Sequence, residues 1–268
     1  MAGGEITLSP HAAMFLSERM DLVPHPMLRV GRLPVSATEE DRLAATDEGR
    51  NHLRSIGLMD HNDLEPVVED AWYALSRPPL AVGLATHSSR GPSYNAVFVD
   101  QGRTVLRARQ ADADDTEDIE NIVLSRNNRV GLASNVTDTI GDLAPGRGAS
   151  VSVPNEQIEQ ARRRAASGSG MQQAFSAARI SRNDAQTLTD ALSNQRTTEG
   201  VVTVRAYDER VRRVHKLPYN VQYFSNDTGS YTMEKKAGRD GREWFTLAPT
   251  DSRKLAAKVD EMVNELRR

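Results

Sequence analysis

Residues 227–230 read D-T-G-S, the order of the aspartic-protease signature. That chemistry needs two carboxylates roughly 3 Å apart that share one proton. The sequence has one copy of the motif, so a hydrolase built on Asp227 would require a dimer across the site. The alternative is a hairpin turn between Tyr223 and Tyr231, in which Gly229 takes a positive φ. The sequence favours the turn.

Four side chains of metal-binding type lie close together in the sequence: His52, Asp60, His61 and Asp63. His52 falls within a predicted helix, and Asp63 is expected to cap the next one. A polar loop is therefore the favoured interpretation, since short metal motifs often match by chance. The chain has no cysteine, which excludes disulfides and thiolate zinc sites. We expect no metal, no cofactor and no catalytic residue.

The composition is that of an ordinary folded protein with a slight excess of acid. The net charge of −3 over 268 residues argues against nucleic-acid binding, which needs a clustered basic excess. No apolar run approaches the roughly 20 residues of a membrane span. The first ten residues show neither the basic nor the apolar part of a signal peptide. We therefore expect a soluble, intracellular protein.

Two parts of the chain have the same order of predicted elements. Strands are expected at Leu80–Ala85, Tyr94–Val99 and Thr104–Arg109, followed by a helix at Asp112–Leu124. Residues 201–266 read as four strands and a closing helix. The shared order predicts a duplicated unit, and two such units would pair edge to edge. The expected fold class is α+β: a central antiparallel sheet with pseudo-twofold architecture, flanked by helices and a helical subdomain.

The remaining segments are predicted to be mostly helical. Helices should begin at Ser9-Pro10, Thr38 and Asp63, where a capping side chain or a first-turn acid is found. Residues 126–148 look polar and irregular. Two or three further helices are expected: one at Glu156–Ala166, one at Met171–Ala178 and a third within Asp184–Leu192. We interpret residues 1–268 as one domain with N-terminal helices (1–79), a first sheet half (80–154), a helical subdomain (155–198), and a second sheet half with the C-terminal helix (199–268).

The order of short motifs along the chain resembles the EspG family of type VII (ESX) secretion proteins from actinobacteria. At the N-terminus the motifs are T-L-S and P-H-P-M-L-R-V. In the middle they are L-S-R-P and G-R-G-A-S-V-S-V-P. At the end they are L-P-Y-N-V-Q-Y-F, G-S-Y-T-M and W-F-T-L-A-P-T-D. The resemblance extends over nearly the whole chain, although Gly229-Ser230-Tyr231 stands where the family pattern has G-R-Y.

The resemblance implies a cytoplasmic chaperone and not an enzyme. Its partner would be a PE–PPE heterodimer, bound at the helical tip of the PPE subunit and kept soluble for export. The family's binding surface, carried onto this sequence, is the loop Ser88–Pro92, the strand Tyr94–Val99 and the helices between Glu156 and Leu192. The predicted contact residues are Ser88, Arg90, Tyr94, Ala96, Phe98, Met171, Phe175 and Leu188.

Several alternatives stay open at this point. Met171, Phe175 and Leu188 are the largest apolar residues of their segment, so they either contact a partner or join their helices to the sheet. The protein as a whole is a secretion chaperone, a dimeric aspartic hydrolase using Asp227, or an interaction scaffold without a secretion role. A homodimer of the free chain is also compatible with the sequence.

Overall fold

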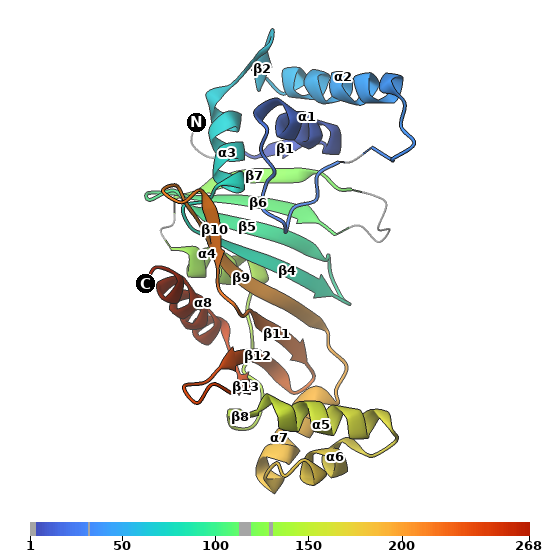
Figure 1. Ribbon diagram of the computed structural model, residues 1–268, viewed down its shortest axis with the longest axis vertical. Coiled ribbons are helices and arrows are strands. Elements are labelled where there is room, and N and C mark those ends of the chain that lie inside the picture. Colours follow the sequence, from blue (N-terminus) through green and yellow to red (C-terminus); the bar gives the residue numbers. More distant parts are fainter. Residues whose placement is uncertain (1–3, 32, 113–118, 129–130) are drawn as a thin grey trace.

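The computed structural model (Figure 1) describes residues 4–31, 33–112, 119–128 and 131–268. It is an α+β fold around an antiparallel sheet of 11 strands, ordered β1-β7-β6-β5-β4-β9-β11-β12-β13-β8, with β10 paired to β9. The strands are β1 (Ile6–Leu8), β4 (Ala81–Ser88), β5 (Tyr94–Asp100), β6 (Val105–Ala111), β7 (Ile122–Asn127), β8 (Val151–Pro154), β9 (Thr198–Asp208), β10 (Arg213–Lys216), β11 (Val221–Asn226), β12 (Gly229–Ala237) and β13 (Glu243–Pro249). A separate small hairpin joins β2 (Met59–Asp60) to β3 (Asp63–Leu64).

The centre of the sheet is the antiparallel pair β4 and β9. It runs from Ala81 opposite Arg205 to Ser88 opposite Thr198. On one side of this pair the chain continues through β5, β6 and β7, and on the other through β11, β12 and β13. The expected edge-to-edge joining of the two parts is therefore present.

Helices cover the sheet in three groups (Figure 1). They are α1 (Pro10–Met20), α2 (Glu39–Ser55) and α3 (Pro66–Ser76) at the N-terminal end; α4 (Leu132–Ile140) and α8 (Ser252–Leu266) on the opposite face of the sheet; and α5 (Asn155–Ala166), α6 (Met171–Ala177) and α7 (Arg182–Leu192) at the far end. None of the helices in the described ranges is both long and apolar enough to cross a bilayer.

Each helix group has its own hydrophobic core against the sheet. The N-terminal helices bury Trp72 against Val97 and Val99 of β5. Helices α4 and α8 cover Phe98, which lies between those two valines in the sequence. The third group packs Phe175 against the far strands. Successive residues of β5 thus enter different cores, because side chains alternate across a strand.

Local capping explains where several helices begin. Ser9 Oγ accepts a hydrogen bond from the Ala12 N–H (3.2 Å) at the start of α1. Thr38 forms a capping box with Asp41 at the start of α2. These two predicted starts are confirmed. The predicted cap at Asp63 is wrong: Asp63 pairs with Asp60 in the small hairpin, and α3 begins after it, at Pro66.

Two other predictions for the middle of the chain are corrected. The helix predicted at Asp112–Leu124 falls partly on residues 113–118, outside the described residues; its end is instead part of strand β7. Ile122 and Leu124 are buried at a spacing of two, and β7 pairs with both β6 and β1. Residues 126–148, predicted as irregular, contain α4. Its sequence, L-A-S-N-V-T-D-T-I, is rich in poor helix formers, and its burial under the sheet compensates for this.

Candidate partner-binding groove

A groove crosses the sheet face between the N-terminal helices and the α5–α7 group. Its floor consists of five half-buried side chains on five adjacent strands: Asn95, Ala85, Val201, Gln222 and Met233. The register places them in one continuous cross-strand row. Asn95 lies opposite Ala85, Ala85 opposite Val201, Val201 opposite Gln222, and Gln222 opposite Met233. Residues directly opposite each other point to the same side of a sheet, so this row forms one surface. We call these five residues the groove floor.

The same cross-strand row continues into a closed end. Gln110 of β6 lies opposite Asn95 and is buried. The side-chain amide of Gln110 forms two hydrogen bonds with the backbone of Arg29. It accepts one from the Arg29 N–H (2.7 Å) and donates one to the Arg29 carbonyl (2.8 Å). This pair fixes the N-terminal connection over the sheet. Gly83 allows the approach, because a Cβ there would lie 2.8 Å from His25 Cε1.

The opposite end of the groove is formed by helices. A second hollow shares Arg196, Gln222 and Met233 with the first and extends to Ile158 and Arg162 of α5. Lys235 Nζ on β12 donates to Glu159 of α5 (2.9 Å), and this hydrogen bond lowers the pKa of Glu159. The α5 helix is thereby held beside the groove floor.

The loop Ser88–Pro92, which we call the rim loop, directly follows His87 of the groove lining. Its Ser89 N–H and hydroxyl both donate to the carbonyl of Thr197 (3.0 and 3.2 Å), which lies between α7 and β9. Ser88 is half-buried, and Arg90 is exposed. The structure therefore brings this predicted loop together with the end of the helical subdomain.

The predicted strand residues Tyr94, Ala96 and Phe98 lie on the face of the sheet opposite to the groove. Ala96 and Phe98 are fully buried beneath α4 and α8, and the Tyr94 hydroxyl donates to the Thr139 carbonyl of α4 (2.8 Å). Because side chains alternate along a strand, the residue that β5 contributes to the groove is Asn95.

Two of the three predicted helix residues are also buried. Phe175 and Leu188 are 3% and 0% exposed and pack with Phe224, Tyr231 and Leu247. They join the helices to the sheet, as the alternative interpretation held. Met171 packs against this core but is only half-buried.

Sequence reasoning missed most of the groove floor. Gln222 stands between two buried residues, Val221 and Tyr223, and this single polar position in V-Q-Y was the available signal. Arg196 was also missed. It pairs with Glu199, and its guanidinium lies 4.6 Å from the centre of the Phe224 ring. The groove therefore offers amide, cationic and apolar groups together.

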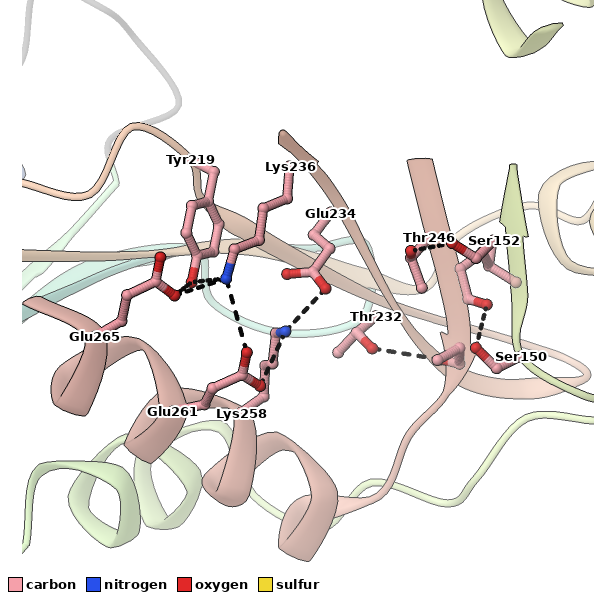
Figure 2. Close-up of polar contacts among 12 residues, drawn as sticks. Ser150, Ser152, Tyr219, Thr232, Glu234, Lys236, Thr246, Lys258, Glu261 and Glu265 are labelled. Carbon is pink, nitrogen blue, oxygen red and sulfur yellow. Dashed lines mark hydrogen bonds and ion pairs between the residues drawn. The ribbon is translucent and has the colours of Figure 1, made fainter. Parts of the chain in front are cut away.

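The back of β12 shows how the groove is supported (Figure 2). Met233 belongs to the groove floor, whereas Glu234 and Lys236 point to the other face and meet α8. Lys258 donates to Glu234 (2.8 Å) and Lys236 to Glu265 (2.6 Å). These pairs fix β12 from behind.

Neither candidate chemical site assembles. Asp227 is an exposed residue of the turn between β11 and β12, in which Gly229 has φ 115°. His52 Nε2 contacts the Thr7 carbonyl (2.9 Å), and His61 contacts Asp60 (2.7 Å). Across the described part of the chain, no three His, Asp or Glu side chains are grouped so as to hold a metal ion. The turn interpretation of D-T-G-S agrees with this geometry.

The model of the EspG family matches residues 9–261 of this sequence. The chain belongs to the EspG family. This confirms the resemblance seen in the sequence. No curated protein matches the sequence.

Among solved structures, the EspG protein is similar to EspG5 of Mycobacterium tuberculosis. EspG5 is a type VII secretion system chaperone, and that structure is a complex with the PE25–PPE41 dimer. The TM-score is 0.71 with 17% identity, covering 98% of this chain and 96% of that one. At this identity the likeness establishes the fold. A 12:0-ACP thioesterase from Umbellularia californica reaches a TM-score of only 0.18 at 10% identity, over 92% of this chain and 98% of that one, which carries no argument.

Proposed function

We propose that this EspG protein is a cytoplasmic type VII secretion chaperone whose groove binds the helical tip of the PPE subunit of a PE–PPE dimer. The observation that carries the proposal is the continuous row of half-buried side chains across five adjacent strands of the sheet. EspG5, which has the same fold, was solved with such a dimer bound. The role of the chaperone is to keep the tip soluble and to direct it to export.

The composition of the groove suits a reversible chaperone contact. Ala85, Val201 and Met233 offer apolar surface, and each Å² of apolar surface that the tip buries contributes about 25 cal/mol. Asn95 and Gln222 require hydrogen-bonding partners when covered. A partly polar interface limits affinity, and release for export demands such a limit.

Three of the predicted contact residues remain candidates in this proposal. Ser88 and Arg90 lie in the rim loop, where an incoming helix would meet them first. Met171 is half-buried on α6. Arg90 is exposed and would pair with an acidic residue near the tip of the partner.

Co-expression tests the function directly. The chain, expressed with a PE–PPE pair encoded near it, should yield a soluble 1:1:1 complex in size-exclusion chromatography. Gln222→Arg, in the groove floor, should abolish that complex. The matched control is Thr246→Arg, a half-buried position whose side chain points to the opposite face of β13 toward Ser152.

Three outcomes would contradict the proposal. If no complex forms and the pair stays insoluble, a scaffold without a secretion role becomes the better interpretation. If Gln222→Arg and Thr246→Arg bind equally well, the groove is not the binding surface. A free chain that sediments as a dimer, and loses this state on Gln222→Arg, would assign the groove to self-association instead.

We also infer that the two sheet halves are copies of one unit. The runs β4-β5-β6-β7-α4 and β9-β11-β12-β13-α8 have the same order, and β4 and β9 meet at the centre. Superposition of the two runs tests the inference. If the corresponding strands do not superpose together with their helices, the inference is wrong.

A further inference from the structure

The β9–β10 ribbon projects from the sheet at the end of β9 remote from the groove. Residues 199–201 of β9 line the groove, whereas residues 205–208 of the same strand pair with β10. Every residue of β10 is exposed. We call residues 205–216 the ribbon.

The ribbon is held in a fixed position and is not a loose loop. The Tyr73 hydroxyl of α3 donates to Glu209 (2.9 Å), and the Tyr207 N–H donates to the Pro78 carbonyl (2.7 Å). The guanidinium of Arg77 lies 5.7 Å from the ring centre of Tyr73 and 5.5 Å from that of Tyr207. Because the strand edge is already ordered in the free protein, binding a partner loses less conformational entropy than ordering a flexible loop would.

The hydrogen-bond pattern shows which β10 groups face outward. The Leu217 N–H donates to the Val204 carbonyl (3.3 Å), so these two residues form a hydrogen-bonded pair. In an antiparallel ladder such pairs alternate with pairs that do not bond each other. Val214 and Lys216 belong to the second kind, opposite Tyr207 and Arg205. Their N–H and carbonyl groups therefore point to the open edge of β10.

The ribbon has the opposite charge to the chain as a whole. Residues 205–216 contain five Lys or Arg and two acidic residues, in a protein of net charge −3. Val211 and Val214 add exposed apolar surface, at 55% and 41% exposure. Open edges attract further strands. Pairing of two ribbons from different copies would bring like charges together, which disfavours self-association.

We propose that the ribbon binds an acidic, extended segment of a partner protein, which adds a strand to the outer edge of β10. Backbone groups of Val214 and Lys216 provide the main-chain hydrogen bonds. The basic side chains select acidic neighbours, and Val214 contacts an apolar residue between them. This surface is separate from the groove, so the chaperone has a second docking site that stays open when cargo is bound.

The test measures fluorescence anisotropy of a labelled peptide, ETEVETEVE, with the full chain. The peptide KTKVKTKVK is the charge control. The acidic peptide should bind, and raising salt from about 50 to about 300 mM should weaken it several-fold through screening. Arg210→Glu with Lys216→Glu should weaken binding at least tenfold. Arg239→Glu with Arg253→Glu, the same charge change at exposed residues outside the ribbon, should leave binding within twofold.

Strand addition makes one sharper prediction. Val214→Pro removes an outward N–H without removing a bond to β9, so it should abolish binding, while Val214→Ala should retain most of it. Equal binding of both peptides, or equal effects of the two charge-reversed pairs, would overturn the proposal. So would equal binding by the two Val214 variants. Ribbon-dependent binding to anionic phospholipid vesicles, without peptide binding, would assign the ribbon to a membrane surface instead. None of these readouts depends on the groove.

Discussion

Lys258 of α8 and Glu234 of β12 form an ion pair at 2.8 Å, with side chains only 21% and 17% exposed. Burial opposes the charge on Lys258, but its hydrogen bonds to Glu234 and Glu261 outweigh burial and raise its pKa. Glu234 directly follows Met233 of the groove floor. The pair thus joins the C-terminal helix to the strand that supports the groove (Figure 2).

Lys258→Met should destabilise the fold by about 1–3 kcal/mol, because it leaves the Glu234 carboxylate partly buried without this cation. Urea unfolding measures the loss. Lys254→Met, an exposed lysine of the same helix, should change stability by less than about 0.5 kcal/mol. The double variant with Glu234→Met should recover part of the loss. Equal stability of the two single variants would show that the pair contributes little.

Stability should fall in acid partly through Glu265. The hydrogen bond from Lys236 lowers the pKa of Glu265 below its ordinary value of 4.5, against burial, and Tyr219 adds to the lowering. A depressed folded pKa stabilises the protein above the unfolded pKa, and the contribution disappears as pH falls through the folded value. Urea midpoints should therefore fall less for Glu265→Gln than for the wild type between about pH 6 and pH 3.5. If the urea midpoints of Glu265→Gln and the wild type fall in parallel as the pH is lowered, Glu265 does not contribute to the acid sensitivity.

Phe98→Ala should act on stability and not on binding. Phe98 is fully buried beneath α4 and α8, so truncation should cost about 3–5 kcal/mol. Asn95→Ala, on the other face of β5, should cost much less but weaken the PE–PPE complex. Thermal unfolding and complex formation by the folded protein separate the two effects. If a fully folded Phe98→Ala protein loses binding, Phe98 is a partner contact, as the sequence analysis predicts.

Asn226, and not Asp227, should be the important residue of the D-T-G-S turn. Asn226 is buried; its amide donates to the Ala191 carbonyl of α7 (2.8 Å) and accepts from the Thr228 N–H (2.9 Å). Asn226→Ala should cost about 1–3 kcal/mol. Asp227→Ala is the matched control and should be nearly neutral, with no peptidase activity in either protein. If the protein has a peptidase activity and Asp227→Asn removes it, the protein is an aspartic hydrolase that uses Asp227.

Much of the fold could be predicted because its signals are local. Ser9 and Thr38 cap their helices through neighbouring N–H groups, and the three helices after β8 follow their own sequence patterns. Strand β7 and helix α4 could not be predicted in this way. The alternation of Ile122 and Leu124 has meaning only between β6 and β1, and α4 depends on burial for its stability.

For the candidate site, too, some features follow from the sequence and others only from the tertiary structure. The sequence by itself determined the family and the antiparallel sheet, since these rest on motif order and on patterns within each strand. Only the tertiary structure decided that Asn95, and not Tyr94, Ala96 or Phe98, faces the groove. Alternation gives two faces to every strand, but which face stays uncovered depends on where distant helices pack. That choice is set by the α4 and α8 core, which forms only when the whole chain has folded.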